Sequence, residues 1–149
     1  MTEGIPFSEE LAISAGMIGA TVFFHAIVIS TAAAIFRATK SRVWGPMRFV
    51  RDSAMLTILS LILMAAHGVE IWSWAALLER LDAFSSLEEA LYFASVTYST
   101  LGFGDVLLPA EWRLLAGAIA ADGLLLFGLS AAFLLETAAR LRLGGERAN

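Results

Sequence analysis

The 149-residue sequence contains no cysteine, which excludes disulfide bonds, thiolate metal sites and cysteine nucleophiles. It also contains no nucleotide-binding loop and no constellation of nucleophile and base, so we expect neither an enzyme nor a bound cofactor. Charges are absent over long stretches, and 58% of the residues are hydrophobic, with a mean hydropathy of +0.75. This composition is far from that of soluble domains, and it predicts an all-α membrane protein.

Three apolar runs are long enough to cross a hydrocarbon core of about 30 Å as helices. They are residues 11–36, residues 53–78 and residues 113–135. The first run contains one histidine, His25, and no Asp, Glu, Lys or Arg, and the second is interrupted only by His67 and Glu70. The sequence therefore predicts three transmembrane helices.

The distribution of basic residues predicts the orientation. The loop of residues 37–52 and the tail of residues 136–149 both carry several arginines, whereas residues 1–10 carry acids. Because cytoplasmic segments are rich in lysine and arginine, we expect the amino terminus outside and the carboxyl terminus inside the plasma membrane. Trp72 and Trp74, near the outer end of the second run, lie where an interfacial belt of aromatic residues is expected.

Residues 79–112 do not form a simple loop. They begin with the acidic stretch ERLDAFSSLEE, in which SSLEE resembles a helix-capping signal, and continue with an apolar stretch from Leu87 to about Ser99. That stretch is too short to span a bilayer, so we expect it to be re-entrant. Irregular backbone at membrane depth is tolerated only where protein buries it or where it lines an aqueous cavity.

The stretch TYSTLGFGDV, from Thr97 to Val106, follows this short helix. Gly102 and Gly104 can adopt positive φ at little steric cost, which would let successive carbonyl groups turn to one side. Four such strands around one axis would replace the water shell of a dehydrated monovalent cation. The stretch therefore indicates the lining of a cation pore.

TYSTLGFGD resembles the potassium-channel signature, and the resemblance extends from about Leu87 to Leu134. It implies a small bacterial potassium channel with one pore loop per chain, an added first helix, and a homotetramer as the working unit. By this resemblance the ion-binding filter comprises Thr100, Leu101, Gly102, Phe103 and Gly104, with potassium held at the first four. Tyr92, Phe93, Thr97 and Asp105 would support the filter, and Gly123 or Gly128 would act as a gating hinge.

Three positions depart from that pattern. Phe103 replaces the usual tyrosine and loses its hydroxyl, and Leu101 replaces the commoner valine or isoleucine. Val96 stands where some relatives have a glutamate that pairs with the aspartate after the filter. Asp105 therefore needs another partner, either Tyr92 or water at the pore mouth.

Four ionisable groups, His25, His67, Glu70 and Asp122, lie within the predicted spans, and such groups are functional candidates by default. Asp122 would either ring the pore cavity, as a site of magnesium or polyamine block, or face a neighbouring helix. His67 and Glu70 are three residues apart and share one helix face. We expect them to form a polar pair, or a link to His25 or Asp122, in preference to a proton sensor or a metal site.

The sequence as a whole predicts a potassium-selective channel that conducts passively, with K⁺ as permeant ion, membrane lipids around it, and no nucleic acid or other protein partner. A weakly selective monovalent cation channel and a non-conducting accessory protein with the same fold are the alternatives. No arginine repeat marks a voltage sensor and the tail is short, so the gating stimulus is left open.

Overall fold

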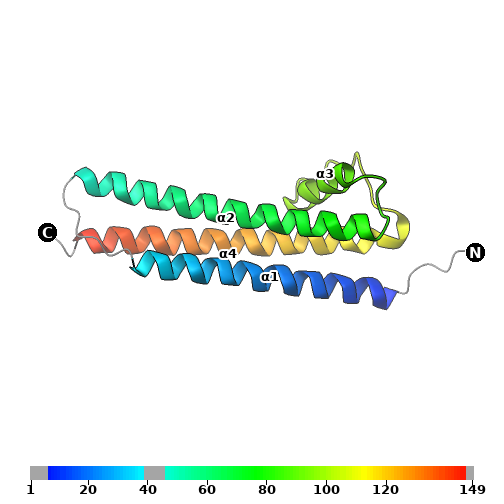
Figure 1. The fold of residues 1–149 in the computed structure, drawn as a ribbon, viewed down its shortest axis with the longest axis horizontal. Coiled ribbons are helices and arrows are strands. Elements are labelled where there is room, and N and C mark those ends of the chain that lie inside the picture. Colours follow the sequence, from blue (N-terminus) through cyan, green and yellow to red (C-terminus); the bar gives the residue numbers. More distant parts are fainter. Residues whose placement is uncertain (1–6, 39–45, 147–149) are drawn as a thin grey trace, which may run out of the picture.

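The computed structural model describes residues 7–38 and 46–146, and this part of the chain is all helical. Three long helices cross the molecule side by side: α1 (Phe7–Ala38), α2 (Pro46–Arg80) and α4 (Arg113–Glu146). The short helix α3 (Leu87–Tyr98) and the 3₁₀ turn η1 (Ala110–Trp112) lie between α2 and α4 in the sequence. Figure 1 shows α3 folded back against one end of the bundle, the end near the amino terminus.

The long helices are apolar enough to cross a membrane over residues 7–37, 47–80 and 110–141, so the chain is a multi-pass membrane protein. Each helix extends beyond the predicted apolar run. α2 begins at Pro46 inside the predicted basic loop, where a proline fits the first turn because no partner is needed there for its missing N–H. α4 continues to Glu146 through residues predicted as a tail, because helix formation does not stop where apolar residues end.

The capping signal predicted before the short helix is present. Ser86 is the N-cap of α3, and its hydroxyl accepts a hydrogen bond from the backbone N–H of Glu89. Lys40, Arg42, Trp44 and Arg147 lie outside the described residues.

The core lies where α2, α3 and α4 meet. Trp74, Leu78, Tyr98, Leu115 and Leu126 are fully buried there, and α1 packs mainly against α4 and α2. The prediction that Trp74 is an interfacial anchor is wrong, because its side chain is completely buried in this core. Trp72, two residues away on the opposite face of α2, is 53% exposed.

Glu10 of α1 stabilises the start of α4. Its carboxylate accepts hydrogen bonds from the backbone N–H groups of Leu114 (2.8 Å) and Leu115 (3.3 Å). These two N–H groups belong to the first turn of α4 and have no partner within their own helix. A carboxylate at this position also interacts favourably with the dipole of α4. The cap of α4 is therefore supplied by a residue of another helix, α1.

Candidate functional site

The backbone after α3 has an alternating conformation. φ is positive at Thr100 (59°), Gly102 (54°) and Gly104 (75°), and among the residues between them neither Leu101 nor Phe103 has a positive φ. Positive φ is easy for glycine but strained for threonine. We call residues 100–105 the filter segment, and positive φ at both of its glycines is what the sequence predicted.

Hydrogen bonds hold the filter segment to the end of α3. The N–H of Thr100 donates to the carbonyl of Thr97 (2.9 Å), and the N–H groups of Leu101 and Gly102 both donate to the carbonyl of Val96 (3.0 and 3.2 Å). These bonds satisfy carbonyls that the helix end leaves without a partner. Among the described residues, no N–H donates to the carbonyl oxygens of residues 100–104, so these oxygens remain free to bind a ligand.

The residues expected to support the filter lie beside it. The Tyr92 hydroxyl donates a hydrogen bond of 2.6 Å to Asp105, which supplies the partner that the sequence left open. This bond holds the pKa of Asp105 below its usual value of 3.8, and it raises the pKa of Tyr92 above 10.0. Phe93 is buried, and Thr97 lines a cavity of about 210 Å³ between α3 and the filter segment.

Gly123 lets α4 approach the carboxyl end of α3 closely. A Cβ atom at Gly123 would lie 2.0 Å from the backbone oxygen of Tyr98 and 2.8 Å from its carbonyl carbon. No real side chain tolerates such distances, so only glycine fits without a shift of α3. The structure thus gives Gly123 a packing contact with α3, whereas a Cβ at Gly128 would meet nothing within 4 Å.

The predicted pair of His67 and Glu70 is part of a larger buried cluster. His67 Nδ1 lies 3.1 Å from Glu70 Oε2, and His25 Nδ1 of α1 lies 2.8 Å from Glu70 Oε1. The other ring nitrogens, both Nε2 atoms, lie 3.0 Å from the hydroxyl oxygen of Ser130 on α4. These four residues form a closed polar ring that joins α1, α2 and α4, and all of them are buried.

Tyr98, the last residue of α3, connects this helix to the polar ring. Its hydroxyl donates to Glu70 Oε2 at 2.5 Å and lies 3.0 Å from His67 Nδ1. Phe127 of α4 packs against both His67 and Tyr98, with ring centroids 4.3 and 5.5 Å away. The last residue of α3 is therefore fixed between α2 and α4, two positions before the filter segment.

Donor atoms of His25, His67 and Glu70 lie within 4.8 Å of one another, close enough to consider a metal ion. Each carboxylate oxygen of Glu70 lies at hydrogen-bond distance from a different imidazole nitrogen, and hydrogen bonds explain this arrangement without an ion. The contacts fit hydrogen bonds better than metal coordination.

Asp122 lies inside the subunit and faces α1 and α2. Its Oδ2 accepts hydrogen bonds from Trp74 Nε1 and from the Thr21 hydroxyl, both of 2.8 Å. Its Oδ1 is buried without a hydrogen-bond partner. Only 1% of the Asp122 surface is exposed. Of the two orientations that the sequence allowed, toward the pore cavity or toward a neighbouring helix, the structure has the second.

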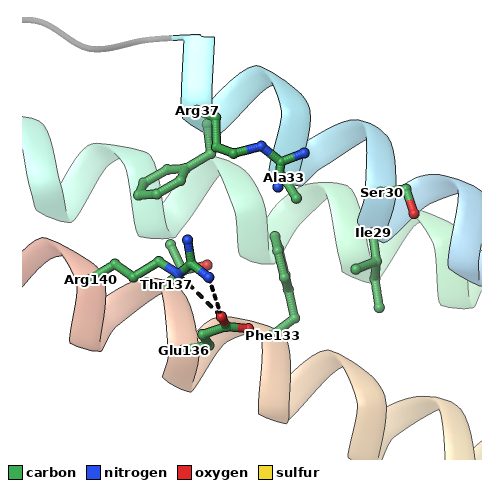
Figure 2. A pocket seen from close by; sticks show the side chains of 9 residues that line it. Ile29, Ser30, Ala33, Arg37, Phe133, Glu136, Thr137 and Arg140 are labelled. Carbon is green, nitrogen blue, oxygen red and sulfur yellow. Dashed lines mark hydrogen bonds and ion pairs between the residues drawn. The ribbon is translucent and has the colours of Figure 1, made fainter.

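A separate cavity of about 250 Å³ lies between α1 and α4 near the opposite end of the bundle from α3 (Figure 2). Arg37 lines its α1 side, while Glu136 and Arg140 of α4 form an ion pair of 2.5 Å on the other side. Both members of this pair are largely exposed, so its contribution to stability is small.

Three features of the site were not predicted from the sequence. They are the positive φ of Thr100, the contact of Gly123 with Tyr98, and the part of Ser130 in the polar ring. A serine within an apolar helix and a second histidine were the available signals for the ring. Neither has a sequence spacing that links it to Glu70, because the three lie on different helices.

Comparison with known proteins agrees with this arrangement. A family model with the description "Ion channel" matches residues 55–140, more than half of the chain, and this stretch contains α3 and the filter segment. No curated protein and no solved structure matches the chain.

Proposed function

The chain belongs to the ion channel family, and we propose that it forms a potassium-selective pore as a homotetramer. Each chain has one filter segment and supplies one quarter of the ring. The carbonyl oxygens of Thr100, Leu101, Gly102 and Phe103 face K⁺ and replace its hydration shell. Conduction is passive, down the electrochemical gradient.

The alternating φ values are the observation that carries this proposal. Positive φ at Thr100 costs energy because a threonine disfavours the left-handed region, and such strain is typical of functional sites. Together with the bonds from the N–H groups to α3, the alternation leaves a column of carbonyl oxygens without a protein donor. A dehydrated cation is the ligand that suits such a column.

Exposure of the filter segment supports assembly. In the single chain, Leu101 is 58% exposed, Phe103 is 64% exposed and Leu107 is 70% exposed. Large apolar side chains on an irregular segment at membrane depth need protein around them. Three further copies around a fourfold axis provide this cover.

The helix α3 adds an electrostatic field that favours cations. Its carboxyl end lies next to the filter segment, and the carboxyl end of a helix carries partial negative charge. In the tetramer four such ends point toward the cavity below the filter and attract cations. The proposed orientation places α3 and the amino terminus outside the cell, with the basic ends of the helices in the cytoplasm.

The test is a potassium flux assay in proteoliposomes, comparing the wild type with Gly102→Ala and with Gly16→Ala. Gly102 has positive φ, so alanine there is strained by about 1–2 kcal/mol and distorts the carbonyl column. Gly16 is exposed on α1, and a Cβ there meets nothing within 4 Å. We expect flux that barium blocks in the wild type and in Gly16→Ala, and its loss in Gly102→Ala. Equal flux in all three, or none in any, would overturn the proposal.

A further inference from the structure

The polar ring of His25, His67, Glu70 and Ser130 is a closed cycle of four contacts. Going round it, Glu70 Oε1 meets His25 Nδ1, His25 Nε2 meets the Ser130 hydroxyl, that hydroxyl meets His67 Nε2, and His67 Nδ1 meets Glu70 Oε2. The contact distances lie between 2.8 and 3.1 Å, within the normal range of hydrogen bonds. Each contact needs one hydrogen atom between its two heavy atoms.

The ring does not contain enough hydrogen atoms if its groups have their ordinary neutral-pH forms. Each neutral imidazole has one N–H, the serine hydroxyl has one O–H, and an ionised glutamate has none. These groups supply three hydrogens for four contacts. Without a fourth hydrogen, one contact would place two lone pairs against each other in a buried site, which is costly.

A single additional proton satisfies the whole ring. Glu70 also accepts a hydrogen bond from the Tyr98 hydroxyl, so its carboxylate has three partners, and only an ionised carboxylate has no hydrogen of its own and can accept from all of them. The proton therefore belongs to the two imidazoles, one of which is an imidazolium at any moment. Their rings are 5.0 Å apart and both contact Glu70 and Ser130, so either can hold the proton. His67 differs in one contact, since its Nδ1 also lies 3.0 Å from the Tyr98 hydroxyl.

The surrounding charges favour retention of this proton. The titratable groups that face the ring are Tyr98 from α3 and Asp122 from α4, in addition to its own members from α1 and α2. No lysine or arginine is buried anywhere among residues 7–37 and 47–141. The imidazolium is the cation that balances Glu70, and its loss would leave an uncompensated buried carboxylate.

We propose that the ring is a proton-binding site that couples the extra helix α1 to the ion filter. This proposal rests on the proposed channel function only for its effect on conduction. When the proton is released at alkaline pH, one ring contact is lost and Glu70 carries an unbalanced charge. Glu70 is the anchor of the Tyr98 hydroxyl at the end of α3, so the pore helix loses part of its support and ion flux falls.

Release of the proton removes the cation that balances the buried Glu70 carboxylate, so the folded state is less stable without the proton than with it.

The direct test is ¹⁵N NMR of the tetramer in lipid nanodiscs with labelled histidine. The chain has only two histidines, and both are in the ring, so every signal reports on this site. Purification must use an affinity tag without histidine. At pH 7 we expect three of the four ring nitrogens per subunit to be protonated, and two of the four at pH 9 or above.

Glu70→Gln is the matched control because it keeps the shape of the side chain. An amide can donate to one imidazole and accept from the other, so two neutral histidines, Ser130 and the amide satisfy all four contacts without an additional proton. We expect two protonated nitrogens at every pH in this variant. Ser130→Ala serves as a second variant, because without the hydroxyl the two remaining contacts need only the two imidazole N–H groups.

Potassium flux and thermal unfolding are then followed from pH 6 to pH 9. The wild type should lose flux severalfold and unfold at a lower temperature as the pH rises, while Glu70→Gln should show neither change. Two protonated nitrogens in the wild type at all pH values, or zinc found in the purified protein with nitrogen shifts of metal-bound imidazole, would overturn the proton site. A titrating ring in a protein without flux would contradict the channel function and leave the proton site intact.

Discussion

The backbone oxygen of Tyr98 lies so close to Gly123 that a Cβ atom there would come within 2.0 Å of it. The carboxyl end of α3 is thus held from two sides. α4 contacts its backbone at Gly123, and α2 contacts it through the bond from the Tyr98 hydroxyl to Glu70. The position of the filter segment depends on both contacts, because it begins two residues later.

Gly123→Ala is expected to displace α3 from α4. The added methyl group meets backbone and not a flexible side chain, so the protein cannot adapt cheaply, and overpacking of this kind costs about 1–3 kcal/mol. We expect a lower unfolding temperature in detergent and loss of potassium flux. Gly117→Ala is the control, since Gly117 also lies on α4 and a Cβ there would meet nothing within 4 Å. Normal flux in Gly123→Ala would show that the close contact is not needed.

Removal of the Glu10 carboxylate should destabilise the start of α4. The backbone N–H groups of Leu114 and Leu115 lose their acceptor in Glu10→Ala, and loss of such a cap costs about 1 kcal/mol. Glu10→Gln keeps an acceptor oxygen and should cost less. Glu9, which is exposed on the same turn, supplies the control Glu9→Ala. Hydrogen exchange at Leu114 and Leu115 would measure the effect, and equal protection in all three variants would exclude a capping role.

The bond between Tyr92 and Asp105 should have a defined pH range. Because Tyr92 lowers the pKa of Asp105 below 3.8, the bond stabilises the pore mouth above that pH and is lost as the pH falls through the lowered value. The measurement is the lifetime of the conducting state in the wild type and in Tyr92→Phe. The difference between the two lifetimes should be constant from pH 5 to pH 8, and this difference should vanish in stronger acid. In Asp105→Asn the Tyr92→Phe change should have little effect, and a large further effect there would mean that Tyr92 acts through other contacts.

Asp122→Asn should not alter block by internal magnesium or polyamines. The side chain faces Trp74 and Thr21 inside the subunit, and asparagine keeps an oxygen that accepts their hydrogen bonds. The sequence allowed a pore-facing Asp122 because one helix alone does not show which face meets the axis. The measurement is the block by internal magnesium at a series of voltages. A clear loss of block in Asp122→Asn would place the carboxylate in the ion pathway.

The sequence was sufficient for features that depend on local order. The short helix after a capping serine and the glycine alternation both follow from spacing along one stretch of chain, and Tyr92 was one of the two partners that the sequence left open for Asp105. The structure has the capped helix, positive φ at both glycines and the Tyr92–Asp105 bond.

Features that depend on how helices rotate against one another could not be predicted. Trp74 lies in a position typical of an interfacial anchor, and only the packing of α2 on α4 turns it into a buried donor for Asp122. The polar ring combines His25, Glu70 and Ser130 from three helices, and no periodicity within one helix relates them. The positive φ of Thr100 could not be predicted either, because threonine is not a residue type that favours positive φ.

The reversal potential of the reconstituted protein distinguishes a potassium-selective pore from a weakly selective one. With potassium on one side of the bilayer and sodium on the other, a filter of stacked carbonyl oxygens from Thr100 to Phe103 predicts a reversal potential close to the potassium equilibrium value. Gly102→Ala should abolish the current or move the potential toward zero, while Gly16→Ala should leave it unchanged. A wild-type reversal potential near zero would contradict potassium selectivity and identify a weakly selective cation pore.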